Sequence, residues 1–229
     1  MSISKHQNGG SRRAPRRDGT ATRSVILEAA GQVFAERGFS DATSKEICER
    51  AGANSAAVNY YFGGKESLYG EVLREAHQQM LRFEDLNAII ASAMPPEEKL
   101  RAFLGGLIHT ATVSSGLWGL KVFLRELAVP TPHVAKAMDT AVLPKTHLLR
   151  RLIADLTGLD PESAKVQRAV AFVVLPCVSL IMFPESLRTR VLPATAARGE
   201  GMLEDMLAYA LGGLRAIGKG GKGGSGAPE

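Results

Sequence analysis

Cysteine, tryptophan and long apolar runs are scarce in this sequence. The 229 residues include two cysteines and one tryptophan. Two scattered cysteines form neither a disulfide framework nor a metal cluster, and they suit a reducing compartment. The most apolar stretch, Ala169 to Phe183, is interrupted by Pro176 and Ser179 and is shorter than a membrane span. The N-terminal residues are polar and basic, without a signal-peptide core. We therefore expect a cytoplasmic protein with no membrane contact.

Catalytic and cofactor-binding signatures are also missing. None of the five histidines is paired with another histidine, a cysteine or a carboxylate at metal-ligand spacing. No P-loop, nucleophile elbow or dinucleotide fingerprint is present. We expect no metal, no cofactor and no enzymatic activity. A helical enzyme remains an alternative class, and turnover that survives removal of residues 1–80 would favour it.

Positive charge is concentrated at the N-terminus. Residues 1–19 hold five basic residues and one acidic residue, a net charge of +4, whereas residues 20–80 hold six and eight, a net charge of −2. The arginines that precede the first expected helix are Arg12, Arg13, Arg16 and Arg17. A basic arm beside a folded domain is a common device for binding nucleic-acid phosphates. A solvated, disordered terminus without a partner is an equally good interpretation.

Helical periodicity dominates the chain after residue 20. Strand alternation is absent, and prolines and glycines fall between the apolar-periodic segments. The expected helices cover residues 22–37, 43–51, 55–61, 65–83, 97–112, 115–128, 131–157 with a kink at Pro144, 162–183 and 200–217. The sequence therefore predicts an all-α protein with two helical domains, residues 20–80 and residues 81–217. The flanking arm (1–19) and the glycine-rich tail (218–229) are expected to be disordered.

Two short segments within the first domain have the form of a helix-turn-helix. Thr43 to Glu46 reads as a capping box that opens the first helix. A three-residue turn begins at Gly52, and Asn54 can cap the second helix. In such a unit the second helix enters the major groove of DNA with its N-terminus first. The pattern predicts binding of double-stranded DNA, although an ordinary helical hairpin remains an alternative.

The second helix carries side chains suited to DNA. Ser55 and Ala56 are small, so the backbone can approach phosphates closely. Asn59 lies one turn later and can pair with adenine, and the hydroxyl of Tyr60 can reach a phosphate. The glycine pair that follows permits a sharp turn. Lys65 then lies at the start of the next helix, where its ammonium is expected to contact phosphate.

The order of these residues resembles the DNA-binding domain of the TetR family of transcription regulators. The resemblance covers residues 22–80 and includes "ILEAAGQVFAERGFSDAT" followed by "SKEICERAGANSAAVNYYFGGKESLYGEVL". It implies a homodimer that binds a palindromic operator and a C-terminal domain that binds a small effector and the partner subunit. Carried onto this chain, family contacts to the DNA backbone fall on Thr43, Ser44, Tyr60, Tyr61 and Lys65, and base contacts fall on Ser55, Ala56 and Asn59.

Some residues depart from the family pattern. Asn59 stands where tyrosine is commoner, and Asn54 stands where serine or threonine is commoner. The pair Gly63-Gly64 replaces a turn that usually contains proline. The resemblance therefore implies the family's mode of docking on DNA with a base preference of its own.

The C-terminal domain resembles the CecR-like subgroup of these regulators through "LWGLKVFLRELAVPTPHVAKAMDTAVLPKTHLLRRLIADLTGLDP". A pocket for a small hydrophobic effector would need apolar walls and a few polar anchors. Candidate pocket residues are His109, Trp118, Phe123, Arg125, Met138 and Cys177. The alternative is that the aromatic residues belong to the core and that Arg125 forms an ion pair with its neighbour Glu126.

Two apolar helices are expected to join the subunits. Residues 169–183 are too apolar for a solvent-facing helix, and the last expected helix also carries an apolar side. That side consists of Met202, Leu203, Met206, Leu207 and Leu211. A four-helix contact would hold two recognition helices about 34–36 Å apart, one turn of DNA. An effector could tilt helix 65–83 and release the operator; a regulator of the same fold that ignores small ligands remains the alternative.

Overall fold

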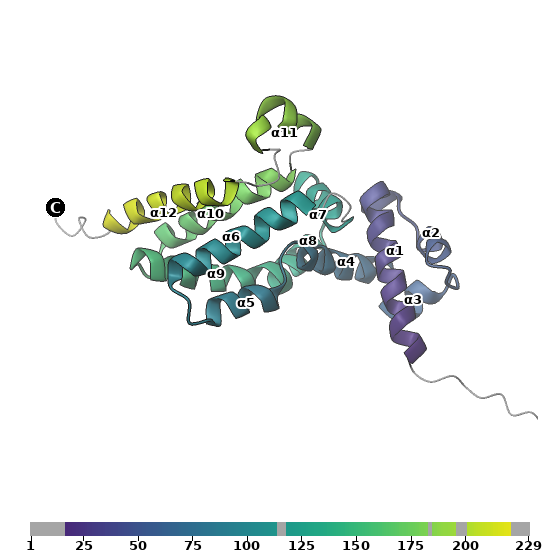
Figure 1. Cartoon of the computed structure of the whole chain (residues 1–229). Helices are drawn as coiled ribbons and strands as arrows, with labels where there is room; N and C mark the ends of the chain where they lie inside the picture. Colours follow the sequence, from purple (N-terminus) through teal and green to yellow (C-terminus); the bar gives the residue numbers. More distant parts are fainter. Residues whose placement is uncertain (1–16, 114–117, 183–184, 196–200, 221–229) are drawn as a thin grey trace, which may run out of the picture.

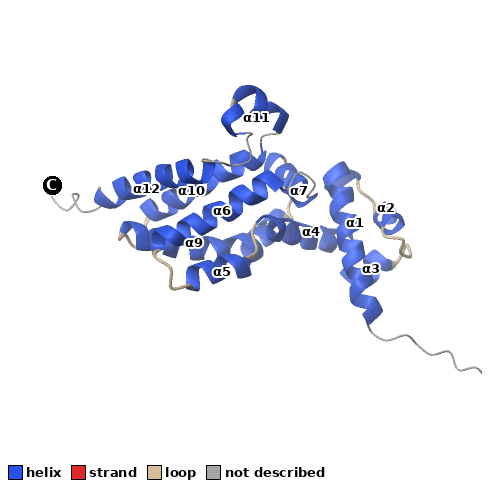
Figure 2. Ribbon diagram, viewed as in Figure 1, coloured by secondary structure: helices blue, strands red, loops and turns tan. Residues whose placement is uncertain are grey.

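The computed structural model describes residues 17–113, 118–182, 185–195 and 201–220, and every regular element among them is helical (Figures 1 and 2). The α-helices are α1 (Arg17–Asp41), α2 (Ser44–Arg50), α3 (Ala57–Phe62), α4 (Lys65–Met80), α5 (Phe83–Ala91), α6 (Pro96–Val113), α7 (Trp118–Ala128), α8 (Val134–Ala137), α9 (Leu143–Thr157), α10 (Ala164–Met182), α11 (Glu185–Val191) and α12 (Met202–Lys219). The all-α prediction is confirmed. The expected kink near Pro144 takes the form of a π-helical turn, Met138–Val142, directly before α9.

Helices α1 to α4 form one unit around a shared apolar core. Phe34 of α1, Ile47 of α2, Val58 of α3 and Leu68 of α4 are almost completely buried in it. Helix α1 begins at Arg17, so residues 17–19 are helical rather than part of a disordered arm. Near its other end the helix is interrupted at Gly38, whose φ of 79° is accessible to glycine at little cost.

Helices α5, α6, α9, α10 and α12 form a second bundle, in which α6 packs against α9, α10 and α12 (Figure 1). Helix α11 projects away from this bundle (Figure 1). Its core contains Phe103, Leu152 and Val166, each at most 1% exposed. Helix α5 closes one side of this bundle against α6 and α9. The bundle therefore has its own apolar core, as expected for a second domain.

Helix α7 joins the two units. It packs against α1 and α4 of the first unit, and its Leu120, Phe123 and Leu124 line a cavity together with residues of α6, α9 and α10 of the second. The ring of Trp118 lies over Gly31 so closely that a Cβ at Gly31 would stand 2.3 Å from it. The indole Nε1 donates a hydrogen bond of 2.8 Å to the Glu28 carboxylate. At the next residue, a Cβ at Gly119 would lie 2.8 Å from the Ala76 Cα. Small residues thus permit a close contact between the domains.

The buried carboxylate of Glu126 stabilises the same contact between α4 and α7. Glu126 of α7 is 3% exposed, and it accepts a 2.7 Å hydrogen bond from the Tyr69 hydroxyl of α4. It also accepts bonds from the backbone N–H and the hydroxyl of Thr131. Burial, together with the bond to Glu126, raises the pKa of Tyr69 well above its ordinary value. Buried charges are stable only when hydrogen-bonded in this way.

Helix α4 is shorter than the sequence predicted. The expected helix 65–83 ends at Met80, because Leu81 adopts an extended conformation with φ −156° and ψ 110°. Lys145 of α9 donates a hydrogen bond to the Leu81 carbonyl at this break. A separate helix, α5, then begins at Phe83. The break depends on a lysine far along the chain, which helical periodicity cannot show.

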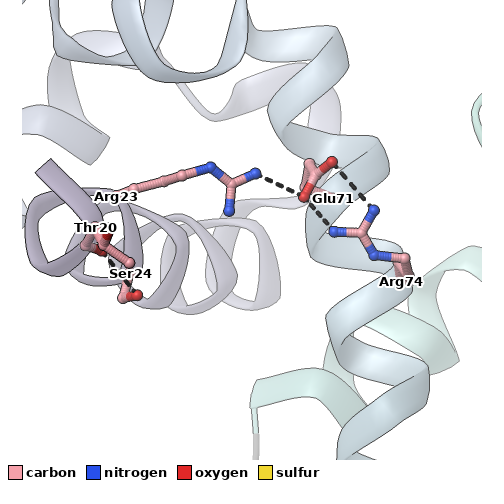
Figure 3. Close-up of polar contacts among 5 residues, drawn as sticks. All are labelled: Thr20, Arg23, Ser24, Glu71 and Arg74. Atoms are coloured by element: carbon pink, nitrogen blue, oxygen red, sulfur yellow. Dashed lines mark hydrogen bonds and ion pairs between the residues drawn. The ribbon is translucent and has the colours of Figure 1, made fainter. Parts of the chain in front are cut away.

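An arginine pair shares one carboxylate between α1 and α4. Glu71 accepts hydrogen bonds from Arg23 of α1, at 2.9 Å, and from Arg74 on its own helix (Figure 3). The Arg23 guanidinium also lies 4.7 Å from the centre of the Phe62 ring. Burial alone would raise the pKa of Glu71, but the bonds from Arg74 and Arg23 outweigh it and lower that pKa. Arg23 thereby connects α1, α3 and α4.

Gly31→Ala should destabilise the contact between α1 and α7, because the added methyl group would overlap the Trp118 ring. We expect a loss of about 1–3 kcal/mol in the free energy of unfolding, measured by urea denaturation. Gly70→Ala is the matched control, since a Cβ there meets no atom within 4 Å and alanine favours a helix by about 1 kcal/mol. Equal stability changes for the two variants would contradict the close contact.

Glu71→Gln should lower the free energy of unfolding at neutral pH by about 1 kcal/mol, since it removes a half-exposed charge pair. Because the folded-state pKa of Glu71 is lowered, its contribution is present above the unfolded-state pKa and disappears as the pH falls through the folded-state value. The difference between wild type and variant should therefore shrink below about pH 4.5. A difference that stays constant down to pH 2 would rule out this role; Glu75→Gln on the same helix serves as control.

Candidate functional site

The turn between α2 and α3 is built from local hydrogen bonds. Thr43 caps α2, and its hydroxyl accepts the Glu46 N–H at 3.1 Å, which agrees with the capping box. Asn54 accepts the Ala56 N–H at 2.9 Å through its side-chain oxygen, which stabilises the turn. The N-cap of α3 is Ala56, without a side-chain cap bond, so the prediction that Asn54 caps this helix is wrong. Helix α3 begins at Ala57, two residues later than expected. Ser55 and Ala56 therefore lie in the turn before the helix rather than in its first turn.

Helix α3 buries one side and exposes the other. Val58 and Phe62 are buried in the core of the α1–α4 unit, whereas Asn59 is exposed and Tyr60 is 81% exposed. The rings of Tyr60 and Tyr61 meet edge to face with their centres 4.9 Å apart. The Tyr60 side chain buries little surface, so it contributes little to the stability of the fold. The exposed face is thus suited to a partner surface that can accept hydrogen bonds from a phenol.

The remaining DNA candidates lie at the start of α2 and in the turn before α3. Thr43 is exposed and Ser44 is half-buried at the start of α2, while Asn54, Ser55 and Ala56 are exposed in the turn. Their contacts with DNA stay a prediction.

Lys65 binds the connection between α1 and α2. Its ammonium donates hydrogen bonds of 2.8 Å to the carbonyl oxygens of Phe39 and Ala42, and the Ser40 carbonyl lies at 3.5 Å. It also lies 4.6 Å from the centre of the Phe39 ring. These bonds tie Lys65 to the connection between α1 and α2, a structural role that the sequence did not predict. Its contact with phosphate stays a prediction.

Charge on the helix-turn-helix is largely balanced by ion pairs. Arg50 of α2 binds both oxygens of Glu36 at 2.7 and 2.8 Å, and Arg37 lies 3.4 Å from Glu46. The hydrogen bond from Arg50 lowers the pKa of Glu36. The arginines of the predicted arm, Arg12, Arg13 and Arg16, lie outside the described residues, and Arg17 opens α1.

A cavity of about 440 Å³ lies among α4, α6, α7, α9 and α10. Its volume is within the range of about 300–1,000 Å³ that is usual for small-molecule sites. Most of its walls are apolar; the polar residues are His77, Lys145, Thr146 and Gln167. A wider groove of about 600 Å³ beside α4 and α5 is lined by charged side chains such as Glu75 and Asp85. The apolar walls make the first cavity the better site for a hydrophobic molecule.

One end of the cavity carries a hydrogen-bonded pair from α4 and α9. The Lys145 ammonium lies 2.8 Å from Nδ1 of His77. Burial lowers the pKa of Lys145 to about 8, and burial together with the Lys145 charge lowers the pKa of His77 to about 4. At neutral pH the imidazole is therefore neutral, and its Nδ1 can accept a hydrogen bond from the ammonium. The His77 ring also meets the Phe123 ring at 5.9 Å.

Only part of the predicted pocket exists. Phe123 and Met138 line the cavity. Trp118 and Arg125 instead contact the DNA-binding unit, since Arg125 donates to the Glu36 carbonyl at 2.9 Å, and His109 is exposed on α6 without lining the cavity. Cys177 is buried in the bundle core against Met206, with burial raising the pKa of its thiol to about 11.

Sequence reasoning missed Lys145 and His77. A signal for Lys145 was present, because it precedes Leu149, Leu152 and Ile153 at helical spacing on the buried face of α9. A lysine on an apolar stripe is rarely buried without a function or a partner. His77 had no comparable signal in the sequence.

The expected dimer face on α12 is also corrected. Leu207 is buried and Leu203, Met206 and Leu211 are half-buried against the core of their own subunit. The side that α10 and α12 share instead presents Phe172 (61% exposed) and Tyr209 (77%). A groove of about 430 Å³ lies between these helices, next to Gly212 and Gly213. We call these exposed residues the α10–α12 face.

Two further features of the described ranges bear on other functions. No cluster of three or more His, Cys, Asp or Glu side chains there could hold a metal ion. No helix in those ranges is long and apolar enough to span a lipid bilayer.

Known proteins share both parts of the chain. The family model of bacterial regulatory proteins, tetR family, matches residues 26–72. The model of the C-terminal domain of the HTH-type transcriptional dual regulator CecR matches residues 96–214. The CecR regulator of Shigella flexneri is 28% identical over 157 residues, which make up 65% of this chain and 70% of that protein.

A second relative and a solved structure agree with this assignment. The HTH-type transcriptional regulator BetI of Brucella canis is 34% identical over 82 residues, 36% of this chain and 40% of that protein. The fatty acid degradation regulator FadR of Bacillus halodurans has the same fold, with a TM-score of 0.63 and 18% identity over 90% of this chain and 99% of the other. Because the CecR-type domain alone covers more than half of the chain and the tetR-type domain covers the helix-turn-helix, this protein belongs to the TetR family of DNA-binding transcriptional regulators, in its CecR-like subgroup.

Proposed function

We propose that this protein is a repressor that binds a palindromic operator as a homodimer. It would leave the operator when a small apolar effector enters the cavity of about 440 Å³ among α4, α6, α7, α9 and α10. The observation that carries the proposal is the position of α7. Leu120, Phe123 and Leu124 of α7 line the cavity, while Trp118 and Val122 of the same helix belong to the core of the DNA-binding unit. A molecule that displaces one side of α7 must disturb the other, because packed interiors transmit strain.

Operator binding is proposed for the exposed face of α3 and the turn before it. Asn59 would read a base, and the Tyr60 and Tyr61 hydroxyls and the Thr43, Ser44, Asn54, Ser55 and Ala56 groups would lie against the DNA. The basic arm would add phosphate contacts beside this site, since ion pairs balance much of the charge on the helix-turn-helix itself. No enzymatic step is part of this function.

The second copy is proposed to pack on the α10–α12 face. Phe172 and Tyr209 line the same groove and are both largely exposed, so their apolar surface would be costly to leave in water. The neighbouring glycines allow helix backbones to approach closely. A two-fold contact there would be self-complementary and would fix the spacing of two α3 helices.

Asn59→Ala should weaken binding to the selected operator by about 1–3 kcal/mol and relax the preference at one base per half-site. Tyr60→Phe should weaken binding to all sequences by a similar factor, because a phosphate contact carries no base information. The measurement is selection of bound fragments from random DNA, followed by titration of the preferred fragment. Unchanged site preference in Asn59→Ala would show that α3 does not read DNA through this residue.

Phe172→Asp and Tyr209→Asp should convert the protein to a monomer at micromolar concentration, because each places a charge in the proposed contact. Sedimentation velocity measures the outcome. Val129→Asp is the control, since Val129 is 75% exposed but lies outside the α10–α12 face. If both variants sediment as wild type does, the subunits meet elsewhere.

A further inference from the structure

Among the described residues that line the cavity, Lys145 is a cation and none is acidic. Lys145 is 3% exposed, and its ammonium contacts the Leu81 carbonyl, Nδ1 of His77 and, at 3.5 Å, the His77 carbonyl. These partners are neutral at physiological pH, given the lowered pKa of His77. No carboxylate in the described part of the chain forms an ion pair with Lys145.

This arrangement carries a cost in the free protein. Burial lowers the pKa of Lys145 to about 8, and Glu84 of α5 counteracts this only through its longer-range charge. The side chain is still mostly protonated at neutral pH, so an ammonium lies beside largely apolar walls. A buried cation without a counter-ion is unfavourable unless a bound anion pairs with it.

We propose that the effector is an amphipathic acid, whose anionic group binds the Lys145 ammonium while its apolar body fills the cavity beside Phe123 and Leu107. This inference rests on the proposed effector role of the cavity. The distribution of polar residues in the site fits such a molecule, because His77 on α4 and Lys145 and Thr146 on α9 supply polar groups to the lining. The remaining lining is predominantly aliphatic and aromatic.

Binding of an anion would also act on α4. The ammonium now holds the end of that helix through the Leu81 carbonyl, and lysine at a helix C-terminus stabilises it through the last carbonyls and the dipole. A carboxylate or similar anion forms a stronger, charge-assisted bond than a neutral carbonyl does. It would compete for Lys145 and loosen the end of the helix that leads to α3. An acidic effector would thereby favour the conformation without DNA.

The test uses two fluorescent probes with the same aromatic body. Anilinonaphthalene sulfonate carries an anionic group, and N-phenylnaphthylamine lacks it. We expect Lys145→Met to weaken binding of the sulfonate probe by about tenfold or more, the loss of a hydrogen bond to a charged group, and to leave the neutral probe within about twofold. Lys121→Met is the matched control, because Lys121 is an exposed lysine on α7 that does not line the cavity.

Three results would contradict the inference or its basis. If Lys145→Met binds both probes as wild type does, or weakens both equally while remaining folded by circular dichroism, the effector is not an acid. If Lys145→Met unfolds, binding of the same two probes is measured with Lys145→Gln. That variant retains a donor for the Leu81 carbonyl without a charge. If the wild-type protein binds neither probe, the cavity is not an effector site and the proposed release mechanism fails with it. Release of the selected operator by the sulfonate probe alone would support both.

Discussion

The docking of α7 between the two domains is the constraint on which the rest of the structure depends. Trp118 can lie against α1 only because residue 31 is glycine, and the buried Glu126 is stable only because Tyr69 and Thr131 donate to it. These contacts fix the angle at which α4 leaves the helix-turn-helix. The orientation of α3 relative to the bundle is therefore decided by packing remote from the DNA-binding face.

Helix α4 is consequently held at both ends by other helices. At its start, Lys65 connects it to the end of α1, and at its end Lys145 of α9 holds the Leu81 carbonyl. Both lysines act as hydrogen-bond donors to backbone carbonyls. Because α4 is a rigid element of sixteen residues held at both ends, a displacement at one end is transmitted to the other. This connection is the physical basis of the proposed coupling between the cavity and α3.

Sequence reasoning succeeded where the relevant interactions are local. The capping of α2 by Thr43, the turn at Asn54 and the left-handed glycine after α3 involve residues within a few positions of one another. It failed where partners are distant in the chain. Trp118 was expected in the pocket and lies in the domain joint instead, because the periodicity of α7 shows two usable faces but not which neighbour each one meets. The α12 prediction failed for the same reason.

The sequence by itself determined the all-α class, the helix-turn-helix with its exposed Asn59 and Tyr60, and the family to which the chain belongs. Those features depend on period, capping and residue order, which short-range interactions enforce. Only the tertiary structure decided which lysines are surface cations and which are internal donors, and which apolar stripes face the core. Such choices follow from contacts between residues separated by tens of positions, as with Lys145 and Leu81. The position of the cavity, and the cation within it, is therefore a property of the packed helices rather than of any one segment.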